Sequence, residues 1–322
     1  MIGKKILIVE DDKVNAFIIK EFIRKQGYEV LNILDSGPAV LEQIKSDPPN
    51  LILMDIKING PYDGIETAIK VREINPIPII YLSAFNDEMI LNRAQKTEPY
   101  GYIVKPIEER TLHATIEMAL YKYQAEQSEL NFKKILQDTV TALATTLELR
   151  DPYTAGHQHR VAELASRIAL EMNMDEETVE GIRIAGILHD IGKIKIPAEI
   201  LANPARLSKI EFELIKQHSE IGYDLLKNIS FPWPISDIVH QHHERINGSG
   251  YPQGLFNESI IIEARIVCVA DVVEAMSSHR PYRPALGIQK ALEEITINKG
   301  ILYDPEVVDA CLSLFQNQKF EF

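Results

Sequence analysis

The first third of the chain alternates short, continuous apolar runs with longer amphipathic stretches. The apolar runs lie at residues 5–9, 29–34, 51–54, 78–82 and 101–104. Runs this short and this rich in Ile, Leu and Val are typical of strands buried on both faces of a parallel sheet. The stretches between them, such as residues 14–27 and 65–74, repeat apolar residues at helical spacing. Strands that alternate with helices predict an α/β fold with a doubly wound, five-stranded parallel sheet.

The pattern changes after Pro106, because residues 107–151 contain neither Gly nor Pro. Their apolar residues recur in steps of three and four, at Leu112, Ile116, Leu120 and Tyr123 and again at Leu136, Val140, Leu143 and Leu147. This spacing predicts a connecting helix or coiled coil over residues 107–150, through which we expect two copies of the chain to form a homodimer. The polar residues 124–129 leave open the alternative of two shorter helices with a frayed junction between them.

Beyond residue 152 the chain shows helical periodicity and few convincing strands, so we expect an all-α second half. The clearest helical patterns are residues 162–172, 181–192, 209–218, 263–276 and 287–295. A chain of 322 residues suits two domains, at about 150 residues per domain. We expect one domain over residues 1–122 and the other over residues 140–322, with the connecting helix overlapping both.

Bulk composition excludes several classes of function. The net charge is -13, so we expect neither DNA binding nor attachment to an anionic membrane. A hydrophobic content of 45% permits a real core, but no run of about 18 apolar residues is present for membrane insertion. Only two cysteines are present, Cys268 and Cys311, which fits a reducing compartment, and we expect a cytoplasmic protein.

Polar and charged side chains follow four of the five predicted strands. Glu10 and Asp11 follow the first strand, Asp55 the third, Ser83 the fourth and Lys105 the fifth. Because the carboxyl ends of parallel strands meet at one edge of a doubly wound sheet, we expect these side chains to converge there. Clustered carboxylates repel one another, and an oxygen-preferring cation such as Mg²⁺ relieves that repulsion.

Over about residues 4–122 this set resembles the receiver domain of two-component response regulators, which has a flavodoxin-like fold. The resemblance implies that a histidine kinase phosphorylates Asp55. It also implies that Asp11 binds Mg²⁺ directly, with help from Glu10 and the backbone carbonyl of Lys57. The side chains that contact the phosphoryl group or respond to it would be Ser83, Lys105 and Tyr102.

The second half concentrates His and Asp residues within otherwise apolar segments. His189 and Asp190 lie in GILHDIGK, and Asp271 lies in VADVVEAM with no adjacent counter-charge. A buried carboxylate is costly unless it is paired or bound to a metal. Further candidate ligands are His157, His218, His242 and His243. This set exceeds what one tetrahedral zinc requires and suits two transition metal ions that share a carboxylate.

The motifs HDIGK (189–193), HHER…GSGYP (242–252) and RPYRPA (280–285) resemble the HD-GYP domain, a branch of the HD metal-dependent phosphohydrolases, over about residues 140–322. That family hydrolyses cyclic di-GMP to pGpG and, in some members, to GMP. The resemblance implies a first metal held by His157, His189, Asp190 and Asp271. It implies a second metal held by His218, His242 and His243, with Asp190 as the bridge. Catalytic roles would fall to Asp190 and Lys193, and substrate contacts to Tyr251, Arg280 and Arg283.

Two residues depart from the family pattern. Some members carry a glutamate four positions before the first histidine; here Tyr153 stands there, so we expect two metals rather than three. Asn247 replaces a common aspartate. The mixed nitrogen and oxygen ligands suit Fe, Mn, Zn, Ni or Co, and the resemblance favours Fe or Mn. The alternatives are a non-catalytic cyclic di-GMP-binding or phospho-dependent adaptor protein, and an HD hydrolase of a hybrid cyclic dinucleotide.

Overall fold

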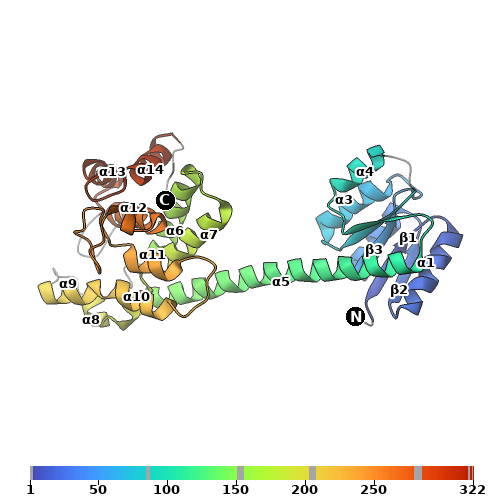
Figure 1. The fold of residues 1–322 in the computed structure, drawn as a ribbon, viewed down its shortest axis with the longest axis horizontal. Coiled ribbons are helices and arrows are strands. Elements are labelled where there is room, and N and C mark those ends of the chain that lie inside the picture. Colours follow the sequence, from blue (N-terminus) through green and yellow to red (C-terminus); the bar gives the residue numbers. More distant parts are fainter. Residues whose placement is uncertain are drawn as a thin grey trace. The chain divides into compact units, whose positions relative to one another are not determined.

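The computed structural model describes residues 3–84, 88–150, 156–202, 208–278, 285–317, 320 and 322. Contacts divide the chain into two compact units, Met1–Lys133 and Lys134–Phe322. The first unit, drawn in blue to green in Figure 1, contains a parallel sheet with helices on both faces. The second unit, drawn in green to red, is built from helices.

The five predicted strands are confirmed. They are β1 (Lys5–Val9), β2 (Glu29–Leu34), β3 (Leu51–Asp55), β4 (Ile79–Ser83) and β5 (Gly101–Val104). All neighbours pair in parallel in the order β2-β1-β3-β4-β5, the flavodoxin-like arrangement. Strands β3 and β4 are buried along their whole length, which explains why their sequences are continuous apolar runs rather than alternating ones.

Helices cover the sheet on both sides. They are α1 (Lys13–Lys25), α2 (Gly37–Ser46), α3 (Gly64–Ile74) and α4 (Glu88–Gln95). Asp12 caps α1 by accepting hydrogen bonds from the backbone N–H groups of Val14 and Asn15, and Asp63 and Glu66 form a capping box on α3. One apolar core joins the sheet to α1 and α5, and another joins it to α2 and α3.

Helix α5 (Glu109–Glu148) is continuous through the polar residues 124–129. Leu112, Ile116 and Leu120 on it are buried in the core of the first unit, whereas Val140 is buried in the core of the second. The apolar spacing seen in the sequence therefore reports packing of α5 within each unit. A contact with a second copy must use other residues of the helix.

The second unit contains the remaining helices, and its described residues form no strand, as predicted. The helices are α6 (His157–Glu171), α7 (Glu176–Leu188), α8 (Ala198–Leu201), α9 (Lys209–Lys216), α10 (His218–Leu226), α11 (Ile235–Gln241), α12 (Ile262–Ser277), α13 (Ile288–Ile297) and α14 (Pro305–Asn317), with 3₁₀ turns η2 (Ile191–Lys195) and η3 (Asn257–Ser259). The prediction that His189 and Asp190 lie within a helix is wrong, because α7 ends at Leu188 and His189 is its C-cap.

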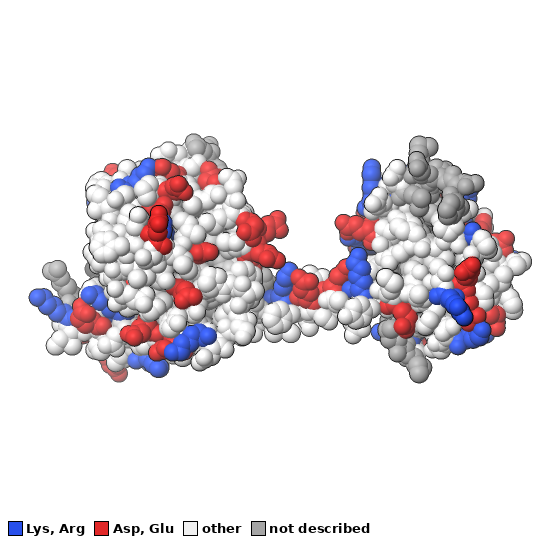
Figure 2. All heavy atoms as spheres, in the orientation of Figure 1, with Lys and Arg blue, Asp and Glu red and all other residues white. Residues whose placement is uncertain are grey.

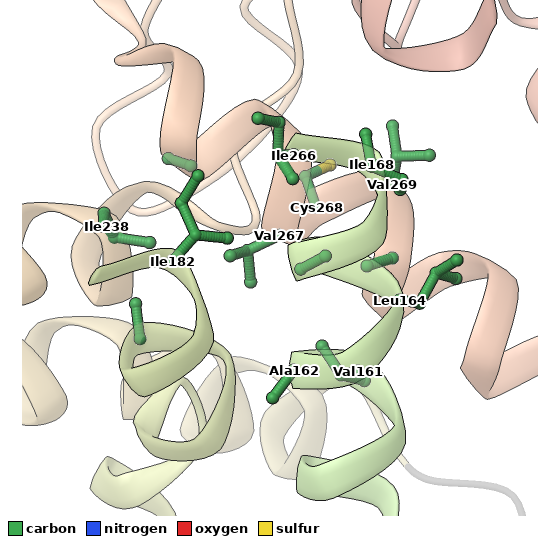
Figure 3. Close-up of a cluster of buried hydrophobic side chains, with 14 of the residues drawn as sticks. Val161, Ala162, Leu164, Ile168, Ile182, Ile238, Ile266, Val267, Cys268 and Val269 are labelled. Carbon is green, nitrogen blue, oxygen red and sulfur yellow. The ribbon is translucent and has the colours of Figure 1, made fainter. Parts of the chain in front are cut away.

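The core of the second unit forms where α6, α7, α11 and α12 meet (Figure 3). Leu164 and Ile168 from α6, Ile182 from α7 and Val267 from α12 all belong to this core and have no exposed surface. Helix α12 lies deepest, since its residues from Ile266 to Asp271 are all buried. A carboxylate on this helix is consequently withdrawn from water and requires a partner inside the protein.

Acidic and basic side chains are interspersed on the faces of both units that Figure 2 shows. An acidic chain that binds an anionic ligand therefore needs positive charge supplied locally. Among the described residues, no helix is long and apolar enough to cross a membrane.

Candidate metal centre and phosphorylation site

The structure brings together all seven side chains predicted to bind metal in the second unit. They come from α6 (His157), the C-terminus of α7 (His189 and Asp190), the start of α10 (His218), the C-terminus of α11 (His242 and His243) and α12 (Asp271). Most sit at helix ends, where side chains from different helices can meet. Their ligand atoms form three overlapping groups, each within 4.8 Å: His157–His189–Asp271, His189–Asp190–His242 and His218–His242–His243.

Asp190 lies between the two outer groups. Its Oδ2 is 3.4 Å from His189 Nε2 and 3.9 Å from His157 Nε2, whereas its Oδ1 is 3.5 Å from His218 Nε2. Asp271 Oδ1 is 3.3 Å from His157 Nε2. All four separations exceed a normal hydrogen bond of about 2.7–3.2 Å, so the rings surround the carboxylates at a spacing that leaves room for ions.

Backbone carbonyls fix which nitrogen of three rings carries the proton. His189, His218 and His242 each place Nδ1 against the carbonyl oxygen three residues earlier, at 2.7, 2.6 and 2.6 Å. A carbonyl oxygen only accepts, so each Nδ1 donates and each Nε2 presents a lone pair in the neutral ring. This is the arrangement that outer hydrogen bonds impose on metal-binding histidines.

The distance between two of these lone pairs tests whether the site fits a cation. His218 Nε2 and His242 Nε2 are 3.2 Å apart. With both Nδ1 atoms protonated, neither Nε2 has a hydrogen to donate to the other, and the two lone pairs repel. A metal ion bound by both nitrogens removes that repulsion, so the donor set fits the expected metal.

Burial and local charge give most of the ligands the protonation state that metals require. His157 is the exception: burial alone would lower its pKa, but Asp271 and Glu274 raise it to about 9, so a metal ion must displace a proton from this ring. Burial lowers the pKa of His218 to about 4 and holds the pKa values of His242 and His243 well below normal. For Asp190, burial alone would raise the pKa, but Lys193 and His189 outweigh it and keep the pKa well below its usual range. The pKa of Asp271 is likewise lowered against burial, chiefly by its contact with His157.

Glu274 is a site residue that the sequence interpretation missed. It is 1% exposed, and its carboxylate bonds to His157 Nδ1 and accepts from Arg160 Nε at 2.7 Å and Ser278 Oγ at 2.6 Å. It orients His157 so that Nε2 faces Asp271. A signal was present in the sequence, because Glu274 is an acid one helical turn beyond Asp271 in the same apolar helix.

The HDIGK motif places a cation beside the central carboxylate. Lys193 Nζ is 2.7 Å from Asp190 Oδ2 across the turn η2. Gly192 lets the turn η2 lie directly against α10, because a Cβ atom at this position would lie 1.9 Å from the carbonyl oxygen of His218. The close approach of η2 to α10 is what carries His218 to Asp190.

The turn after His243 carries Tyr251, whose ring centroid lies 4.7 Å from that of His243. Asn247 Oδ1 accepts hydrogen bonds from the Ser249 backbone N–H at 3.1 Å and from the Ser249 hydroxyl at 2.6 Å. Asparagine and aspartate both carry an Oδ1 acceptor, so the same hydrogen bonds can form in this turn with either residue. Three residues lie outside the described residues: Arg280 and Arg283, predicted to contact substrate, and Tyr153.

The first unit brings its predicted acids together at the carboxyl edge of the sheet. Oxygen atoms of Glu10, Asp11 and Asp55 lie within 4.8 Å of one another, an all-oxygen set that fits Mg²⁺. Lys105 Nζ is 2.7 Å from Glu10 and 2.5 Å from Asp55. Burial alone would lower the pKa of Lys105, but both carboxylates raise it above its usual value.

The other predicted receiver residues lie on β4, on β5 and in the turn that follows β3. The Lys57 backbone N–H donates to Asp55 Oδ1 at 3.1 Å. Ser83 ends β4 and is 8% exposed, and its carbonyl oxygen accepts from the Lys105 backbone N–H at 2.9 Å. The Tyr102 ring lies 5.9 Å from that of Tyr81.

Comparison with known families identifies a domain in each unit. A family model described as "Response regulator receiver domain" matches residues 6–117, and one described as "HD domain" matches residues 141–307. The chain therefore belongs to the response regulators whose output unit is an HD domain, a family of metal-dependent hydrolases.

Several relatives share this organisation or part of it. The chain is 34% identical over 333 residues to "Cyclic di-GMP phosphodiesterase response regulator RpfG" of Xanthomonas campestris, covering 97% of this chain and 88% of that one. It is 34% identical over 334 residues to a "Cyclic di-GMP phosphodiesterase" of Thermotoga maritima, covering 96% and 90%. It is also 34% identical over 171 residues to "3'3'-cGAMP-specific phosphodiesterase 3" of Vibrio cholerae, covering 53% and 37%.

Proposed function

We propose that the chain is a cyclic di-GMP phosphodiesterase that uses two metal ions. It hydrolyses the dinucleotide to pGpG, and on to GMP if the product rebinds. Phosphorylation of Asp55 controls this activity. The observation that carries the proposal is the position of Asp190, with one carboxylate oxygen toward His189 and the other toward His218. A carboxylate placed in this way suits a bridge between two ions. The full-length similarity to two cyclic di-GMP phosphodiesterases supports the choice of substrate.

The chain's own residues prepare the site for a dianionic ligand. His157, His189, Asp190 and Asp271 would hold one ion, and His218, His242 and His243 the other, with Asp190 shared. When bound, the ions supply Lewis-acid stabilisation of the phosphoryl oxygens and make water a nucleophile at neutral pH. Lys193 Nζ adds a positive charge at Asp190, where it offsets charge that develops on the reacting phosphate. The Tyr251 ring beside His243 offers an apolar face to a guanine base.

The test is anaerobic purification, elemental analysis and turnover of cyclic di-GMP beside 3'3'-cGAMP. We expect two ions of Fe or Mn per chain and a larger kcat/KM for cyclic di-GMP. A metal-loaded protein that binds cyclic di-GMP without cleaving it would instead be a sensor or adaptor. Preference for the hybrid dinucleotide would place the chain with the Vibrio cholerae relative, whose match covers 53% of this chain.

Replacing Glu274 with Gln should weaken metal binding by about 10- to 100-fold, the usual effect of losing a partner that orients a ligand. Glutamine keeps the shape of the side chain but removes the charge that holds His157. Competition with a chromophoric chelator measures the affinity. Glu163→Gln, an exposed change on α6, is the matched control. Equal affinities in the two variants would show that Glu274 does not position the ligand.

The connecting helix is proposed to pair with a second copy through a face different from its buried one. Exposed, uncharged residues follow heptad spacing on α5: Met118, Tyr121, Ala125, Ser128, Phe132 and Ile135. Because a second copy presents the same stripe, the two can pack in register.

Phe132→Glu should give a monomer by light scattering, since like charges facing each other cost several kcal/mol, or more than about 100-fold in affinity. Gln127→Glu adds the same charge off the stripe and should leave the mass unchanged. If both variants and the unaltered chain have the same mass, the stripe is not an interface between copies.

A further inference from the structure

Glu244 directly follows the two adjacent histidines of the candidate metal centre, and its side chain binds the backbone of a later segment. The residue is 2% exposed. Its Oε1 accepts hydrogen bonds from the N–H groups of Gln253 at 2.7 Å and Gly254 at 3.1 Å, and its Oε2 accepts from Leu255 N–H at 3.0 Å. Three backbone N–H dipoles therefore point at this buried carboxylate and stabilise it.

The turn between Glu244 and these amides touches the same short segment at two more points. The Tyr251 N–H donates to the carbonyl oxygen of His243 at 3.3 Å. A Cβ atom on Gly250 would lie 2.4 Å from the Cα atom of Glu244, so the turn rests directly on that backbone and only glycine fits. The Tyr251 ring then lies over the ring of His243, tilted by 34°.

We propose that Glu244 is a positioning residue that locks the turn 247–255 so that Tyr251 stands at a fixed place beside the metal centre. The inference rests on the proposed function, because it assigns Tyr251 a contact with the dinucleotide. A carboxylate suits this role since both oxygens accept. A glutamine in its place would turn a donor NH₂ group toward an amide N–H, and one of the three bonds would be lost.

The experiment compares Glu244→Gln with Glu258→Gln in the full-length, metal-loaded protein. Glu258 is exposed in the neighbouring turn η3, so its variant removes the same charge nearby without touching these amides. Hydrogen exchange at the amides of Gln253, Gly254 and Leu255 should be at least tenfold faster in Glu244→Gln alone. The KM for cyclic di-GMP should rise by about 10- to 100-fold, as expected for a contact displaced by about 1 Å.

Two further measurements separate positioning from damage to the metal centre. Metal content and the hydrolysis of bis(p-nitrophenyl) phosphate, a small diester that needs the ions but not Tyr251, should stay within twofold of the unaltered enzyme. Glu244→Asp keeps the charge and should recover part of the KM. Unchanged amide exchange, unchanged KM, or equal losses on both substrates would overturn the proposal. If the unaltered enzyme cleaves the small diester but not cyclic di-GMP, the proposed function is refuted. The hydrogen-exchange data would still show whether Glu244 holds the turn 247–255 in place.

Discussion

Asp190→Asn is expected to reduce hydrolysis of cyclic di-GMP by at least about 10³-fold, because metal-ion stabilisation of the transition state is worth several kcal/mol and each 1.4 kcal/mol is tenfold in rate. The change keeps the shape of the side chain and removes the charge that faces His189 and His218. An amide offers one oxygen instead of two and no formal charge, so it cannot serve two ions. Elemental analysis should show fewer than two ions per chain, and the loss of turnover should track the loss of metal.

Glu220→Gln is the matched control for this experiment, since it makes the same carboxylate-to-amide exchange at an exposed position on α10. It should retain both metal and activity. Full turnover by Asp190→Asn, or loss of turnover with both ions still bound, would refute the role of Asp190 as the bridge.

Asp55→Asn is expected to remove the response of the enzyme to phosphorylation. In the unaltered protein, acetyl phosphate or beryllofluoride should change turnover by about 5- to 150-fold, the range that a typical coupling energy of 1–3 kcal/mol allows. The physical cause lies at Lys105, whose ammonium group contacts both Glu10 and Asp55. A phosphoryl group adds about 1.5–2 negative charges there, so Lys105 and the surrounding carboxylates must rearrange. In Asp55→Asn the ratio of turnover with and without the phosphodonor should be about one.

The control here is Asp35→Asn, an exposed exchange in the same unit that should leave the response intact. A response that persists in Asp55→Asn would locate the phosphorylated residue elsewhere. An unaltered protein that is phosphorylated without any change in turnover would show that the receiver and the HD domain are not coupled.

The sequence was most informative where one physical cause acts along a short stretch of chain. A strand buried on both faces is predominantly apolar, so the apolar runs of β3 and β4 could be recognised without a structure. The histidines and acids of the motifs could be predicted as site residues for a similar reason, because imidazoles and carboxylates in apolar segments require partners. Their spacing along the chain also matched known families.

The helix α5 shows where such reasoning stops. Periodicity marks Leu112, Ile116 and Val140 as buried but does not say what buries them, and it suggested a second copy where the structure has the cores of the two units. The exposed stripe that includes Met118 and Phe132 is interrupted by small and polar residues, so the sequence pattern alone did not bring it out.

By itself, the sequence determined the five-stranded sheet, the helical second half, and the residue types that two metal-dependent sites require. Only the tertiary structure decided which partners complete those sites. His157 meets Glu274 across 117 positions of sequence, and Glu244 meets the amides of a turn through a carboxylate that could equally have been solvated. Such contacts depend on how helices pack and where turns close. A local sequence pattern does not specify the distance between two side chains that come together only on folding.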